Sequence, residues 1–138
     1  EIDNLLNKES GLKGICGTND MREVLERRKA GDERAEVALE VYTYRIKKYI
    51  GAYMAVLGRL YVLVFTGGIG ENSPIVRERC CKNLSRLGIN IHDEKNTTSG
   101  EGVQQISLSD GEVKVLVVPT NEELKIAQET KMVINSDC

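Results

Sequence analysis

Residues 61–74 read YVLVFTGGIGENSP, and their order alone indicates an α/β unit. The apolar, β-branched run at 61–65 is typical of a buried parallel strand. A glycine-rich turn follows at 66–72, and a helix start is then predicted, with Ser73 as N-cap and Pro74 at the first helical position. A strand that leads directly into a helix N-terminus presents free N–H groups and the positive end of a dipole, which favour anionic ligands.

A second strand signal lies at residues 113–118, which read VKVLVV and end before Pro119. Thr120 and Glu123 then have the spacing of a capping box. This spacing predicts a further helix with Thr120 as its N-cap and with Glu123 bonded back to the Thr120 N–H.

Upstream of the glycine-rich turn the pattern is helical. Asp20 and Glu23 predict a short helix that starts with a capping box. From 32 to 57 apolar residues recur in steps of three and four, which predicts one long amphipathic helix. We also expect a short strand at 89–91 and a loop or hairpin over 95–111. The alternation of helices and strands predicts a three-layer α/β domain.

Composition narrows the function classes. The chain has 138 residues, enough for one domain, and its 19 basic and 21 acidic residues give a net charge of −2. That charge excludes a broad electrostatic grip on nucleic acid or anionic lipid. No apolar run approaches the roughly 18 residues of a membrane-spanning helix. We expect a cytoplasmic protein, because the N-terminus has no signal-peptide pattern, and a piece of a longer chain, because it has no initial Met.

The cysteines offer no metal site. Cys16, Cys80, Cys81 and Cys138 form no C-x-x-C pair, and His92 is the only histidine. Zinc sites need closely spaced Cys or His ligands, which this sequence lacks. We expect all four cysteines to be reduced thiols, as in most cytosolic proteins.

Three segments have both a functional and a structural interpretation. The glycines at 66–72 leave room for a nucleotide, but the pattern is neither a P-loop nor a Rossmann fingerprint, and a tight turn without ligand stays equally open. Asp20 either caps a helix or binds a ribose hydroxyl with Arg22 against the base, and the residues alone favour the cap. Glu122 and Glu123 suit a helix start, which is favoured, while Glu122 alternatively holds a divalent cation directly or through water.

Several motifs resemble the acetate kinase family (acetate/propionate kinase), in order and over nearly the whole chain. The similarity is to the C-terminal portion of the family only. Together the motifs fit acetate and propionate kinases better than butyrate kinases. The matching segments are NKESGL at 7–12, Asp20-x-Arg22, YIGAY at 49–53, VFTGGIGENS at 64–73 and VVPTNEEL at 117–124.

The resemblance implies a fold of the sugar kinase, heat-shock protein and actin (ASKHA) superfamily, with two ribonuclease H-like domains and a cleft between them. Residues 1–138 would form the C-terminal part of the nucleotide-binding domain, with helices flanking a small, mostly parallel sheet. The N-terminal domain would be absent, and with it the phosphate loop, the carboxylate pocket and the catalytic histidine motif. We therefore expect no catalytic residues in this segment.

The resemblance also implies the site and its ligands. The nucleotide-binding residues would be Asp20, Met21, Arg22, Gly68, Ile69, Gly70, Glu71 and Asn72. Glu122 would bind Mg²⁺, with ATP or ADP as substrate and acetate or another short-chain carboxylate as acceptor. The implied reaction is the reversible conversion of ATP and acetate to ADP and acetyl phosphate, by a homodimer. Two alternatives stay open, a propionate kinase segment and a catalytically silent nucleotide-binding or oligomerisation module.

Overall fold

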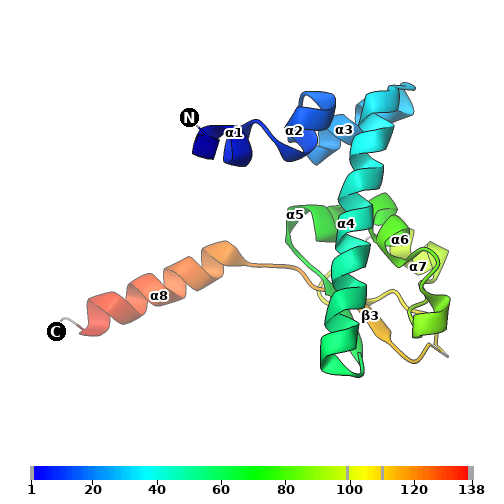
Figure 1. The fold of residues 1–138 in the computed structure, drawn as a ribbon. Helices are drawn as coiled ribbons and strands as arrows, with labels where there is room; N and C mark the ends of the chain where they lie inside the picture. Colours follow the sequence, from blue (N-terminus) through cyan, green and yellow to red (C-terminus); the bar gives the residue numbers. More distant parts are fainter. Residues whose placement is uncertain (1, 99, 110, 137–138) are drawn as a thin grey trace.

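The computed structural model describes residues 2–98, 100–109 and 111–136, and Figure 1 shows helices gathered around a small sheet. The elements in chain order are α1 (Ile2–Lys8), α2 (Gly11–Cys16), α3 (Met21–Lys29), α4 (Glu33–Leu57), β1 (Val62–Phe65), α5 (Gly67–Asn72), α6 (Pro74–Cys81), the 3₁₀ helix η1 (Ser85–Leu87), α7 (Asp93–Thr97), β2 (Gln104–Gln105), β3 (Lys114–Val117) and α8 (Glu122–Ser136).

The sheet has the strand order β1-β3-β2. The two strands predicted from sequence are parallel neighbours, in a register that pairs Val62 with Lys114 and Phe65 with Val117. β2 runs antiparallel to β3, so the sheet is mixed. This arrangement confirms the predicted α/β class. The two-sided burial predicted for β1 is wrong: Phe65 is buried, but Val62 and Val64 are exposed on the opposite face.

The long helix α4 forms the axis of the molecule. Its N-terminus is capped by Asp32, which accepts hydrogen bonds from two backbone N–H groups, and its 25 residues extend for roughly 37 Å. α2 and α3 pack near one end and α6 packs further along (Figure 1). Apolar side chains of α3, α4, α6 and β3 meet in the core, among them Val24, Leu39, Val76, Cys80 and Val115.

The segment predicted as a glycine-rich turn is mostly the helix α5. Gly67 has a φ of +70°, which a side chain would disfavour, and the chain then turns helically through Asn72. Gly70 packs against the end of β1, where an added Cβ would lie 3.3 Å from the Phe65 carbonyl carbon. The Ser73 side chain makes no capping bond, although Pro74 does begin α6 as predicted.

Two further expectations need correction. Residues 89–91 form no strand, because only Ile91 pairs, in an isolated bridge with Ser107. The stretch 95–111 contains the end of α7 and the short strand β2 as well as loop. Cys16, Cys80 and Cys81 are free thiols as predicted, whereas Cys138 lies outside the described residues.

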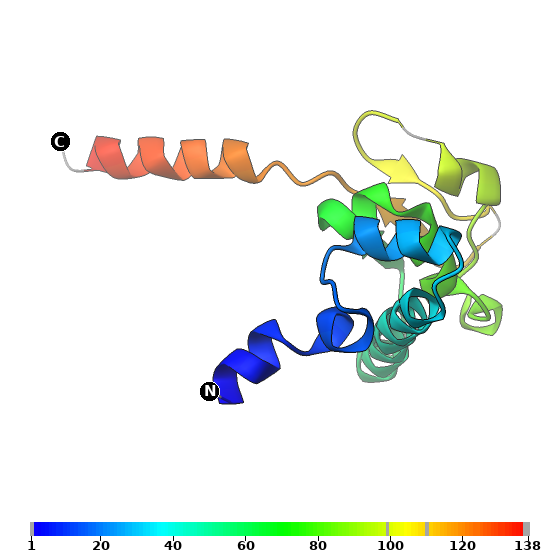
Figure 2. The same ribbon diagram turned by 90° about the horizontal axis from the view of Figure 1, so that it is seen from above.

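The helix α8 begins differently from the prediction and extends away from the rest of the structure (Figures 1 and 2). Its N-cap is Asn121, whose Oδ1 accepts a hydrogen bond from the Leu124 N–H at 2.9 Å. Thr120 is therefore not the cap and Glu123 is not at the third helical position, so the predicted capping box does not form. No helix among the described residues has the length and apolarity needed to cross a membrane.

Candidate functional site

The N-terminus of α3 and the helix α5, distant in sequence, line one cavity of about 440 Å³. Six of the eight predicted nucleotide-binding residues contribute to it, and two other residues complete the lining. The lining residues are Asp20, Met21, Arg22, Leu25, Gly68, Ile69, Asn72 and Ser73. The structure thus brings together the two segments that the family resemblance marks for the nucleotide.

Asp20 combines helix capping with an ion pair at the edge of this cavity. Its carboxylate accepts the Arg22 N–H at 2.9 Å, and its Oδ2 lies 2.7 Å from an Arg22 guanidinium nitrogen. These bonds, led by the Arg22 side chain, lower the pKa of Asp20 to about 2. Asp20 is therefore ionised at neutral pH, and the exposed Arg22 guanidinium is available to a ligand.

The capping box predicted at Asp20 operates through a third residue. The Asp20 N–H donates to Thr18 Oγ1 at 3.2 Å, and the Thr18 hydroxyl donates to Glu23 Oε2 at 2.7 Å. Next to it, Met21 is buried and anchors the start of α3 in the core. Because Met21 directly precedes Arg22, this anchoring also fixes the position of Arg22 relative to α5.

Within α5, the five predicted nucleotide-binding residues divide between different faces. Gly68, Ile69 and Asn72 line the cavity shared with Asp20, whereas Gly70 and Glu71 do not. Asn72 also steadies the helix, since its Nδ2 donates to the Gly68 carbonyl at 3.0 Å. Fewer residues of α5 therefore line this cavity than the family resemblance implies for the nucleotide.

The Glu71 side chain reaches the connector before α8. Its Oε1 accepts hydrogen bonds from the Thr120 N–H at 2.9 Å and the Thr120 hydroxyl at 2.7 Å. These two bonds, the hydroxyl first, lower the pKa of Glu71. Glu71 occupies the place that the sequence pattern assigned to Glu123, as the acceptor for the Thr120 N–H.

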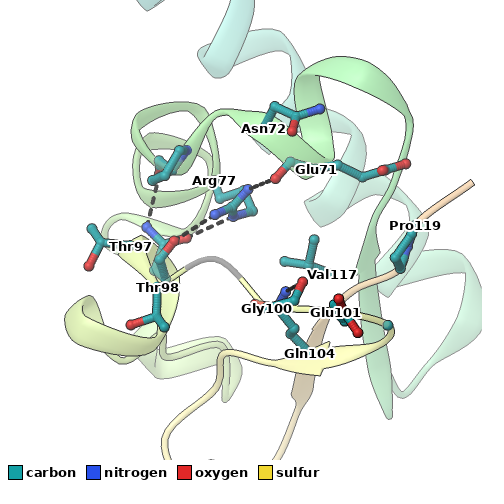
Figure 3. A pocket seen from close by; sticks show the side chains of 13 residues that line it. Glu71, Asn72, Arg77, Thr97, Thr98, Gly100, Glu101, Gln104, Val117 and Pro119 are labelled. Carbon is teal, nitrogen blue, oxygen red and sulfur yellow. Dashed lines mark hydrogen bonds between the residues drawn. The ribbon is translucent and has the colours of Figure 1, made fainter.

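A second cavity of about 430 Å³ lies between Glu71, α7 and the segment around Pro119 (Figure 3), and Asn72 lines both cavities. Arg77 lies at its edge and is only 4% exposed. Its guanidinium donates to the carbonyls of Gly70 and Glu71 at 2.8 and 2.7 Å, and to Asn96 Oδ1 at 2.8 Å and Asn96 O at 2.6 Å. Burial lowers the pKa of Arg77.

Sequence reasoning missed this role of Arg77. No local signal marks it, because its acceptors Gly70, Glu71 and Asn96 lie in other segments of the chain. Because Arg77 binds the last carbonyls of α5, it fixes the orientation of the segment that lines the first cavity.

Glu122 is the first residue of α8 and is exposed. Its carboxylate has no hydrogen bond or ion pair with any residue that the structure describes, and it lines neither cavity. The described residues also contain no group of three or more His, Cys, Asp or Glu side chains that would hold a metal ion by themselves. A single free carboxylate suits Mg²⁺ bound mainly by phosphate oxygens and water, a common arrangement for this ion.

Comparisons with a family model and with curated proteins point to the same family. The model of the acetokinase family matches residues 1–128. The acetate kinase of Syntrophobacter fumaroxidans is 53% identical over 130 residues, which cover 94% of this chain and 32% of that protein. The chain therefore spans about a third of the length of the curated relatives it matches.

Solved structures extend the likeness to three dimensions. An acetate kinase from Porphyromonas gingivalis matches with a TM-score of 0.87 and 43% identity, over 96% of this chain and 34% of that one. A propionate kinase from Francisella tularensis matches with a TM-score of 0.82 and 44% identity, over 93% of this chain and 32% of that one. The ASKHA-type fold expected from the motifs is thereby confirmed. Motifs, sequence identity and three-dimensional likeness agree, and the chain belongs to the acetokinase family.

Proposed function

We propose that this chain is the nucleotide-binding C-terminal segment of an acetate kinase, which converts ATP and acetate reversibly to ADP and acetyl phosphate. The observation that carries the proposal is the cavity shared by the start of α3 and by α5. It combines an ionised carboxylate, an exposed guanidinium and a glycine-rich helix, the groups that suit a nucleoside. Relatives named acetate kinase and propionate kinase support the reaction class.

Each residue then has a definite task. Asp20 accepts a hydrogen bond from a ribose hydroxyl, and the exposed Arg22 plane stacks on the base. Gly68 lets the ligand approach the backbone of α5, since an added Cβ there has no neighbour within 4 Å and would extend into open space. Ile69 and Asn72 complete the wall of the cavity.

Glu122 would hold Mg²⁺, directly or through water. The ion, when bound with the nucleotide, neutralises charge on the phosphate oxygens. Glu122 suits this task because its carboxylate is exposed and has no partner among the residues that the structure describes. The acyl group remains a short-chain carboxylate, because both an acetate kinase and a propionate kinase match this segment closely.

Phosphoryl transfer requires charge stabilisation from several directions at once. Along the cavity, the described residues contribute one exposed guanidinium, that of Arg22. We therefore propose that the chain by itself binds nucleotide without turnover, and that the remaining catalytic groups come from the rest of a full-length kinase. We also propose a cytoplasmic homodimer, supported by the apolar side chains exposed along α8, which include Leu124, Ile126, Met132, Val133 and Ile134.

The test uses a chimera in which this chain replaces the matching segment of the Syntrophobacter fumaroxidans acetate kinase, to which it is 53% identical. ADP binding is measured by calorimetry, and acetate-dependent ADP formation by a coupled assay. We expect binding and turnover in the chimera, and a loss of ADP affinity of roughly tenfold in Arg22→Ala. Arg86→Ala, in η1 outside the cavity, is the matched control and should bind ADP normally. Equal ADP affinity in the two variants would show that this cavity is not the nucleotide site.

A further inference from the structure

We propose that Glu71 is a positioning residue, not a nucleotide contact: its carboxylate holds the connector 118–121 against α5 and so places Glu122 relative to the nucleotide. This inference rests on the proposed function, because it assigns Glu71 a task in the same site. It replaces the direct contact with nucleotide that the family resemblance implies for Glu71.

The first support is the direction of the side chain. Glu71 lines the second cavity and not the one shared with Asp20. Figure 3 shows its carboxylate extending toward the strand end that carries Pro119. One oxygen, Oε1, accepts both the N–H and the hydroxyl of Thr120. Two bonds to a single residue fix that residue's backbone more closely than one bond would.

The second support is that the connector is hydrogen-bonded to the rest of the structure at two positions, Val118 and Thr120. The Val118 N–H donates to the Phe65 carbonyl at 2.9 Å, and the Thr66 hydroxyl donates to the Val118 carbonyl at 2.8 Å. Glu71 adds the attachment at Thr120, two residues before Glu122. Residues 118–120 are thus tied to the end of β1 and to α5, and α8 starts immediately after them.

The third support is the rigidity of the attachment point. The Glu71 carbonyl accepts a hydrogen bond from the buried Arg77 at 2.7 Å, so the backbone of Glu71 is itself held in place. Glu71 therefore links a fixed helix to a connector that otherwise leads into the projecting α8 (Figure 2). Without the bond to Thr120, the last attachment before Glu122 lies at Val118.

The consequence is a separation of two effects. Loss of the Glu71–Thr120 contact should leave the nucleotide cavity intact but misplace the carboxylate that accompanies the nucleotide's metal. Residues that orient metal ligands from behind typically change metal affinity by roughly tenfold or more when they are lost. A change at Glu71 removes both bonds, whereas a side-chain change at Thr120 removes the hydroxyl bond and should give a smaller effect in the same direction.

The experiment compares four single variants and the Glu71→Ala/Thr120→Val double variant in the chimera described above. Glu71→Ala removes both bonds of the contact and Thr120→Val removes the hydroxyl bond, whereas Glu71→Gln and Thr120→Ser retain an acceptor oxygen and a hydroxyl. Three quantities are measured: ADP affinity in EDTA, the Mg²⁺ concentration that gives half-maximal tightening of ADP binding, and hydrogen exchange of the peptide covering 118–124 in metal-free protein. Melting curves identify any variant that fails to fold.

We expect Glu71→Ala to keep ADP affinity in EDTA within about twofold and to raise the Mg²⁺ requirement roughly tenfold, with faster exchange over 118–124. Thr120→Val, which keeps the backbone N–H bond to Glu71, should shift the Mg²⁺ requirement and the exchange in the same direction by less. The two conservative variants should stay near the parent, and the double variant should be no worse than the more affected single one. If Glu71→Ala weakens ADP in EDTA as much as Arg22→Ala does, Glu71 contacts the nucleotide and the inference is wrong. An unchanged Mg²⁺ requirement in both disruptive variants would overturn it as well. Failure of the proposed function is distinct, because the unsubstituted chimera would then bind no ADP.

Discussion

Replacement of Arg77 by lysine tests how α5 is held. The guanidinium makes four hydrogen bonds, two to the terminal carbonyls of α5 and two to Asn96 in α7. A lysine ammonium is a single point and can keep one or two of them. Bonds to charged groups contribute about 1.5–3 kcal/mol each, and part of the loss is offset because water from the adjoining cavity reaches the freed carbonyls. We expect Arg77→Lys to lower the free energy of unfolding by about 2–4 kcal/mol.

The measurement is thermal unfolding of the chain followed by circular dichroism. For a chain of this size 1 kcal/mol corresponds to roughly 4 °C, so the melting temperature should fall by about 8–16 °C. Arg79→Met is the matched control on the same helix, because Arg79 makes a single ion pair, with Glu36 at 2.6 Å, and Glu36 keeps Arg28 as its other partner. Its loss should cost no more than about 1 kcal/mol. Equal shifts for the two variants would refute the reasoning, since the buried hydrogen bonds of Arg77 would then contribute no more than the single ion pair of Arg79.

Two other predictions concern α8 and the buried thiols. Asn121→Ala should destabilise α8 by about 1 kcal/mol and lower its helicity, measured by circular dichroism, whereas Glu123→Ala should change neither. The reverse result would show that Thr120 and Glu123 form the capping box after all. Burial raises the pKa of Cys80 to about 11 and of Cys81 to about 12, so both should react with a thiol reagent at pH 8 only after unfolding. Rapid labelling of the native chain at pH 8 would contradict their burial. The thiols ionise at lower pH in the unfolded chain than in the folded one, so these two groups should also lower the free energy of unfolding as the pH rises from about 9 toward 11.

The sequence predicted those elements whose signals are local. The apolar residues in steps of three and four predicted the helix over 32–57, and α4 occupies Glu33–Leu57. The two apolar, β-branched runs predicted β1 and β3, because such residues favour a pleated, partly buried strand over other conformations. In these segments the signal that predicts the element lies within the element itself.

Elements that are stabilised by residues far away in the sequence could not be predicted from local signals. The glycines of α5 favour a turn locally, but Gly70 packs on Phe65 and Arg77 binds the helix's last carbonyls, so tertiary contacts stabilise a helix. Likewise Thr120 has the local spacing of a cap, yet Glu71, far away in sequence, accepts its N–H. In both cases the partner is visible only in the folded chain.

The same distinction applies to the candidate site. The motifs at Asp20–Arg22 and 68–72 could be recognised from their resemblance to a family. The residues that share a cavity depend on how α4 and the strand after it place α5 beside α3. No rule of local sequence spacing predicts this placement. Composition and spacing therefore identify the two segments, and the structure separates the residues that face the cavity from Gly70 and Glu71, which face elsewhere.

The position of β1 in the sheet matters for work with this chain on its own. β1 pairs with β3 along one edge, and the strand order given by the described residues places no strand on its other edge. The N–H and C=O groups of such an edge form a template for a strand from another molecule, and Val62 and Val64 add exposed apolar surface beside it. Concentrated preparations should therefore assemble by sheet extension, and a lysine in place of Val64 should keep them dispersed by charging that edge.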